Sequence, residues 1–159
     1  VPIAVVIHLP VDYTDAVARR LDSLCALSVR EAADGMALEP GTAVVARGGI
    51  HLGVHVADGV TRAVLDVEPL TTLHRPAVDV LFQTAAAAFG AAVIGVVLTG
   101  MGDDGCAGAR AIKAAGGVML TESEASCVVY GMPRCVYEAG LSDGHAPLDQ
   151  LARLLLEHV

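Results

Sequence analysis

The chain has 159 residues, of which 54% are hydrophobic and 18% are charged. This length fits one domain, and the composition is too apolar for a disordered chain. Eighteen Asp and Glu residues against ten Lys and Arg residues give a formal net charge of −8, which is opposite in sign to a nucleic-acid-binding surface. We therefore predict a single globular domain over residues 1–159 without a nucleic-acid partner.

Charged residues, His, Gly or Pro interrupt every apolar stretch before it reaches the roughly 18 residues that a membrane-spanning helix needs. We expect no membrane insertion. The cysteines form no C-x-x-C pair, and a chain of this length does not depend on disulfide bonds. They are interpreted as reduced core thiols of a cytoplasmic protein: Cys25, Cys106, Cys127 and Cys135.

The first part of the chain has the pattern of a strand, a helix and a second strand. Val1 to Ile7 is a short apolar run that predicts a buried strand. Apolar residues then recur at helical spacing from Tyr13 to Cys25, and a short strand is expected near residues 27–30. Such a unit is typical of a parallel sheet.

A different periodicity between Asp34 and Glu68 predicts an antiparallel insert. Residues 50–56 alternate strictly between apolar residues and His or Gly, which is typical of a half-buried strand. Asp58 and Gly59 then supply a hairpin turn signal.

The second half of the chain returns to alternating helices and strands. The pattern predicts a helix with Val78, Leu81, Phe82, Ala85 and Phe89 on one face, followed by a strand Val93–Leu98. A helix ending near Ala115, a strand Val118–Leu120 and a loop from Thr121 through Pro133 are expected next. Pro147 opens a last helix with its leucines facing inward, namely Leu148, Leu151, Leu154 and Leu155. The expected fold class is α/β, with a doubly wound, mostly parallel sheet, helices on both faces and an antiparallel hairpin insert.

Polar residues that follow buried strands are the first functional candidates, because ligands of open α/β sheets lie beyond the carboxyl ends of the strands. His8 ends the first predicted strand, and the segment from Gly100 to Gly105 follows a later one. A histidine that acts as a general base needs a carboxylate on its second ring nitrogen, and Asp103 or Asp104 is placed to supply it. By position alone, His8 fits equally well a histidine that hydrogen-bonds a carbonyl at a strand end.

The segment from Gly100 to Gly105 has three glycines where the chain turns from strand to helix. Its backbone N–H groups suit a phosphate site or an oxyanion hole. Asp103 and Asp104 would repel an anion, and no Lys accompanies them, so an oxyanion hole is favoured. Capping of the following helix by one Asp, and binding of Mg²⁺ by the pair without a clear third ligand, are the alternatives.

Four other residues have side chains that could carry chemistry. His51 and His55 lie on one strand face about 13 Å apart, too far for one Zn²⁺, and are interpreted as part of a solvated face. Arg75 either contacts a substrate carboxylate or pairs with an acidic neighbour. Cys127 is better explained as a buried thiol than as a nucleophile, because no cationic neighbour would lower its pKa.

Four segments resemble the catalytic domain of the chemotaxis protein-glutamate methylesterases, the CheB family. They are Val5 to Pro10, His74 to Phe82, Leu98 to Gly105 and Glu124 to Arg134, and they follow the family's order over most of the chain.

The resemblance implies a serine hydrolase without metal or cofactor that demethylates glutamate methyl esters and deamidates certain glutamines on the cytoplasmic helices of chemoreceptors. It assigns the general base to His8, the orienting carboxylate to Asp104 and the oxyanion hole to the turn with Met101 and Gly102. It also implies a regulating receiver domain or histidine kinase pathway.

The family's nucleophilic serine lies in a glycine-flanked turn upstream of the strand with the histidine. None of the five serines of this chain follows a strand in such a turn, and Val1 already lies in a predicted strand. We therefore expect that the sequence is a fragment whose nucleophile lies upstream, since loss of a central strand would expose sheet edges. The alternative is a non-catalytic domain of the methylesterase type that binds a receptor or a regulator.

Overall fold

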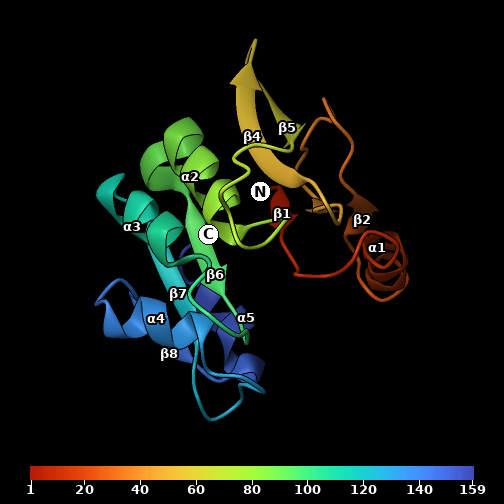
Figure 1. Cartoon of the computed structure of the whole chain (residues 1–159). Coiled ribbons are helices and arrows are strands. Elements are labelled where there is room, and N and C mark those ends of the chain that lie inside the picture. The colour runs from red at the N-terminus through yellow and green to blue at the C-terminus, as the bar shows by residue number, and fades with distance from the viewer. The chain divides into compact units, whose positions relative to one another are not determined.

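The computed structural model describes residues 1–159 and consists of two compact units, Val1–Thr84 and Ala85–Val159. Figure 1 shows the course of the chain, and the boundary between the units falls within helix α2 (Val78–Phe89). Each unit contains a three-stranded parallel sheet with helices, and the first unit also contains an antiparallel hairpin. The predicted α/β class with a hairpin insert is confirmed. That residues 1–159 form one domain stays a prediction.

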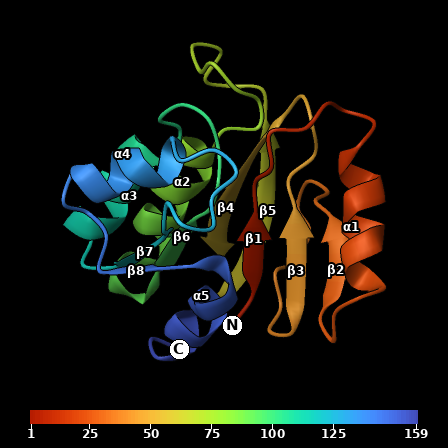
Figure 2. The same ribbon diagram turned by 90° about the horizontal axis from the view of Figure 1, so that it is seen from below.

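The first unit begins with a parallel three-stranded sheet and one helix. Its elements are β1 (Ile3–Val5), α1 (Thr14–Asp22), β2 (Ser28–Glu31) and β3 (Thr42–Val45). The strand order is β1-β3-β2, and Figure 2 shows the three strands side by side with α1 next to β2. Ala18 of α1 packs with Val29, Ala43 and Val45 in a buried cluster.

The prediction for this region was wrong in one respect. Residues 42–45 lie in the segment that the sequence assigned to the antiparallel insert, but they form the central parallel strand. The run is only four residues long, with an exposed Gly41 before it. Its place between β1 and β2 depends on pairings with distant segments, which local periodicity does not report.

The hairpin consists of β4 (His51–Ala57) and β5 (Val60–Asp66), which are antiparallel with Ala57 opposite Val60. The turn residues have φ angles of 52° at Asp58 and 74° at Gly59. Positive φ at both positions is the geometry that favours an Asp-Gly sequence in a two-residue turn. The predicted hairpin turn is therefore confirmed.

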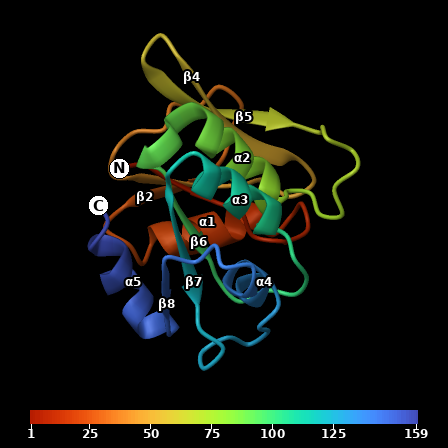
Figure 3. The same cartoon turned by 90° about the vertical axis from the view of Figure 1, so that its left-hand side faces the viewer.

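The second unit contains a parallel sheet with the order β6-β7-β8. After the end of α2 its elements are a short 3₁₀ helix (Gly90–Ala92), β6 (Ile94–Val97), α3 (Cys106–Ala114), β7 (Val118–Glu122), α4 (Met132–Glu138), β8 (Gly144–Ala146) and α5 (Leu148–Leu156). Figure 3 shows α4 and α5 on opposite sides of this sheet. None of the helices of the chain has both the length and the apolar character to cross a membrane.

Three features of this unit differ from the prediction. Helix α4 begins at Met132, where the sequence indicated a loop, and the three-residue strand β8 was not predicted. Pro133 stands in the first turn of α4, a position that favours helix initiation and that was interpreted as the end of a loop. Leu148 is 53% exposed, whereas Leu151 is buried as expected. The first residue of a helix can point away from the core even when the rest of the apolar stripe is buried.

Candidate active site

The glycine-rich turn lies between the end of β6 and the start of α3, as the sequence predicted. Met101 is 78% exposed and Gly102 has a φ of 91°, whereas Asp104 is buried. Gly105 is the N-cap residue of α3, so neither aspartate occupies the capping position. The turn thus combines an exposed backbone segment with a buried carboxylate, and this combination suits stabilisation of charge in a reaction.

A second segment of the same unit, residues 129–132, holds the beginning of this turn. The N–H of Gly100 donates to the carbonyl of Val129 (3.0 Å). The carbonyl of Gly100 accepts hydrogen bonds from the N–H groups of Gly131 (3.0 Å) and Met132 (2.8 Å). The residue before Met101 is therefore fixed through both of its backbone polar groups.

This contact requires glycine at position 131, because the backbone of the turn leaves no room there for a side chain. A Cβ atom at Gly131 would lie 2.7 Å from the carbonyl oxygen of Gly100, 2.9 Å from the nitrogen of Gly102 and 3.2 Å from the Cα of Met101. All three are backbone atoms, which cannot move aside as a flexible side chain does. The segment that resembles the family through Tyr130 to Pro133 thus supports the turn directly.

His8 lies three residues beyond β1 and is exposed. Its ring stacks on the ring of His74, with centroids 4.2 Å apart and an interplanar angle of 19°. His74 is the first residue of one of the segments that resemble the family, but its place beside His8 was not predicted from the sequence. A stacked aromatic partner restricts the orientations of the ring, which a general base requires.

The chain that follows His8 is also held in place. A Cβ atom at Gly48 would lie 2.7 Å from backbone atoms of Pro10 and Val11, so the chain passes directly over this glycine. Thr14, which is buried, donates its hydroxyl to the carboxylate of Glu31 at 2.5 Å and accepts the N–H of Gly48 at 3.2 Å. The turn after β1 is therefore anchored on both sides.

His51 does not lie on a solvated face, and that expectation was wrong. It is 1% exposed, its Nδ1 accepts the N–H of Ala77 at 3.1 Å, and its Nε2 lies 3.1 Å from the hydroxyl of Thr72. His55 is exposed, as expected. Alternation along a strand shows which residues share a face but not which part of that face another segment covers.

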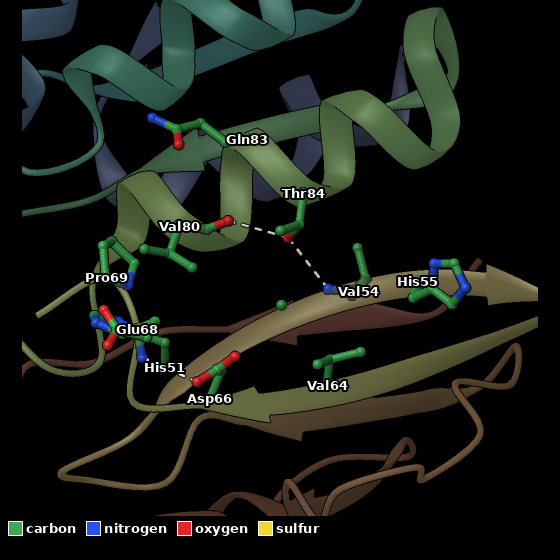
Figure 4. Close-up of a pocket in the computed structure, with 11 residues that line it drawn as sticks. His51, Val54, His55, Val64, Asp66, Glu68, Pro69, Val80, Gln83 and Thr84 are labelled. Atoms are coloured by element: carbon green, nitrogen blue, oxygen red, sulfur yellow. Dashed lines mark hydrogen bonds between the residues drawn. The ribbon is translucent and has the colours of Figure 1, made fainter.

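A groove of about 490 Å³ lies on the face of the hairpin that carries His51 and His55. Figure 4 shows that the first half of α2 forms its other wall. Thr84 joins the two walls by accepting the N–H of Val54 at 3.1 Å. His55 lies at the opposite end of the groove from Asp66 and Glu68. Nowhere in the chain do three or more His, Cys, Asp or Glu side chains form a group that could hold a metal ion.

Among the remaining residues, Cys127 has surroundings that do not favour chemistry. Burial, the charge of Glu122 and a hydrogen bond to that carboxylate raise the pKa of Cys127, which is the wrong direction for a nucleophile. The Nε atom of Arg75 is buried without a hydrogen-bond partner. All four cysteines are free, but Cys25 is exposed, so the expectation of a core thiol was wrong there.

The predicted site residues thus come from both units. Met101, Gly102 and Asp104 share one turn of the second unit, and His8 belongs to the first, where His74 is its neighbour.

Comparison with known proteins gives matches over nearly the whole chain. The profile of the family described as CheB methylesterase matches residues 1–155. The crystal structure of the CheB methylesterase catalytic domain of Thermotoga maritima is similar with a TM-score of 0.96 and 40% sequence identity, covering 99% of this chain and 84% of that one.

Two relatives share the name protein-glutamate methylesterase/protein-glutamine glutaminase. The one from Myxococcus xanthus, number 5 of that name, is 59% identical over 158 residues, covering 99% of this chain and 45% of the relative. The one from Geobacillus kaustophilus is 43% identical over 157 residues, covering 98% of this chain and 45% of the relative. This chain therefore spans about half the length of these relatives, and it belongs to the CheB methylesterase family.

Proposed function

We propose that this chain carries the base, the carboxylate and the oxyanion hole of a protein-glutamate methylesterase that also deamidates glutamine side chains. The observation that supports this most directly is the turn between β6 and α3, with Met101 exposed and Asp104 buried, in a chain that matches the family from residue 1 to residue 155.

In the proposed reaction a serine outside these 159 residues attacks the ester carbonyl of a methylated glutamate. His8 takes the proton of the serine and passes it to the departing methoxide, so that methanol leaves and an acyl-enzyme remains. His8 then takes a proton from water, which attacks the acyl-enzyme, and passes this proton to the serine oxygen as the ester bond to the enzyme breaks and the glutamate product leaves. Asp104 stabilises the imidazolium of His8, and N–H groups of the turn with Met101 and Gly102 stabilise the oxyanion.

We further propose that the substrates are methylated glutamates on the cytoplasmic helices of chemoreceptors, and that the protein acts in the cytoplasm under a receiver domain or a histidine kinase pathway. The family and the names of the relatives support this substrate class.

The test is release of methanol from receptor membranes methylated with tritiated methyl groups, using the complete gene product that contains this chain. We expect His8→Ala and Asp104→Asn each to lower kcat by about 10³-fold or more, because the oxyanion hole and substrate binding alone support only slow turnover. His55→Ala is the matched control, since His55 is an exposed histidine of the hairpin, and it should retain full activity.

Activity that survives both substitutions would show that the roles are wrongly assigned. A parent protein that binds receptor but releases no methanol would instead favour a non-catalytic binding domain.

A further inference from the structure

We propose that Glu122 is a positioning residue that holds the entrance of the oxyanion turn in place. This inference rests on the proposed hydrolase function, but its structural part concerns only contacts within the second unit. Glu122 is the last residue of β7 and its side chain is fully buried. A buried carboxylate is costly unless its oxygens receive hydrogen bonds, so its partners indicate what it is for.

Both carboxylate oxygens of Glu122 have a partner in a segment next to the turn. Oε2 accepts the backbone N–H of Thr99 at 2.8 Å, and Oε1 accepts the hydroxyl of Ser126 at 2.8 Å. Thr99 stands two residues before Met101, so the first bond fixes the chain where it leaves β6 and enters the turn.

The second bond of Glu122 fixes the segment that supports the turn from the other side. Ser126 in turn accepts the N–H of Leu148 at 2.9 Å, which ties this loop to the start of α5. Three residues after Ser126, the N–H of Val129 donates to the hydroxyl of Thr99 at 2.9 Å, and the Thr99 hydroxyl donates to the carbonyl of Val129 at 3.2 Å. One carboxylate therefore holds both the entrance of the turn and the loop that runs beside it.

The contacts of Gly100 complete this arrangement, because residues 129–132 bind both of its backbone polar groups. The N–H groups of Met101 and Gly102 are thus oriented by a chain of bonds that starts at Glu122. Oxyanion stabilisation depends on donors placed within a few tenths of an ångström, and a displacement of about 1 Å can cost about 10²-fold in rate. A loosened entrance should lower kcat without a matching change in KM.

The test compares Glu122→Met with Glu122→Gln in the complete gene product. Met has a similar length without an acceptor, whereas Gln keeps one oxygen for the Thr99 N–H. We expect Glu122→Met to lower kcat for methyl-ester hydrolysis at least about tenfold with KM within about twofold, and Glu122→Gln to remain within about threefold of the parent.

Thr121→Val is the matched control for a purely structural effect. Thr121 precedes Glu122 on β7, is equally buried, and bonds the hydroxyl of Ser142 at 2.7 Å and Nδ1 of His145 at 3.0 Å rather than Thr99 or Ser126. It should lower the melting temperature and leave kcat unchanged. Equal kcat in Glu122→Met and the parent, or an equal loss of kcat in Thr121→Val, would overturn the positioning role.

A measurement without substrate separates this inference from the proposed function. With ¹⁵N-glycine labelling, we expect Glu122→Met to move the amide resonances of Gly100 and Gly102, and Glu122→Gln and Thr121→Val to leave both close to their positions in the parent. Ser126→Ala, which removes the hydroxyl bonded to Oε1, should move them as well. Unmoved resonances in Glu122→Met, or in Ser126→Ala if Glu122→Met does not fold, would refute the positioning role. If the variant shows these shifts and the parent protein has no esterase activity, the proposed function is refuted and the positioning role still holds.

Discussion

Asp143 joins three parts of the second unit, and its removal should destabilise the protein measurably. Its Oδ1 pairs with Nζ of Lys113 at 2.5 Å, and its Oδ2 accepts the N–H of Met119 at 2.7 Å. Lys113 lies in the last turn of α3, Met119 lies in β7, and Asp143 directly precedes β8. We expect Asp143→Ala to weaken the connection of all three elements.

The size of the effect follows from the exposure of each group. The Lys113 and Asp143 side chains are 31% and 34% exposed, so solvent screens the ion pair and its loss should cost about 0.5 kcal/mol. Met119 is fully buried, and an unsatisfied buried N–H costs about 1–3 kcal/mol. Asp143→Ala should therefore lower the free energy of unfolding by about 2 kcal/mol. Asp143→Asn keeps an acceptor for Met119 and should lose only about 0.5 kcal/mol.

The same pair predicts a dependence on pH. Partial burial alone would raise the pKa of Asp143, but hydrogen bonds from Lys113 and Met119, together with the positive charge nearby, lower it below its ordinary value of 3.8. A lowered folded-state pKa contributes stability that is present above the unfolded value and is lost as the pH falls through the folded value. The difference between the parent and Asp143→Asn should therefore be constant near neutral pH and shrink as the pH falls below 3.8.

Urea denaturation followed by far-ultraviolet circular dichroism measures these differences. Equal losses in Asp143→Ala and Asp143→Asn would show that the bond to Met119 contributes nothing. A difference between parent and Asp143→Asn that stays constant down to pH 2 would refute the lowered pKa.

Two further predictions concern the reactivity of the thiols and the burial of His51. At pH 8, Ellman's reagent should label Cys25 first, because this thiol is exposed. It should label Cys135 slowly, because a hydrogen bond with Cys106 and burial raise the pKa of Cys135 to about 11. Rapid labelling of Cys135 in the folded protein, checked by peptide mass spectrometry, would contradict this. His51→Leu should lower the free energy of unfolding by about 1–3 kcal/mol, because the N–H of Ala77 loses its acceptor. His55→Leu, at the exposed position, should change the free energy of unfolding by less than about 0.5 kcal/mol. Equal effects of these two substitutions in urea denaturation would contradict the burial of His51.

The sequence predicted those elements whose signal is local. The hairpin was predicted because Asp58 and Gly59 can adopt positive φ and the flanking residues alternate. Helix α2 was predicted because its apolar residues recur at the helical period over twelve residues. Strand β6 has only four residues, but the longer, mostly apolar run Val93–Leu98 contains it. Strands β3 and β8 have four and three residues without such a longer run around them, and these segments are defined by the strands beside them rather than by their own pattern.

Candidate site residues divide in the same way. Met101, Gly102 and Asp104 were proposed because three glycines between a strand and a helix are visible in the sequence. The support from Glu122 and Gly131 was not predicted, because it depends on contacts between residues about thirty positions apart. The buried state of Glu122 contradicts the usual preference of Glu for the surface, and only the arrangement of its partners explains it.

The close approach of Gly131 to the turn has a consequence for protein engineering. Residues 98–105 and residues 126–132 are separate in the sequence, but they behave as one part, because the backbone atoms of one fill the space that a side chain would need in the other. A graft that moves the first segment alone into another scaffold would lose the surface against which it is shaped. Transplantation of this turn therefore requires both segments, with Glu122 as the residue that fastens them together.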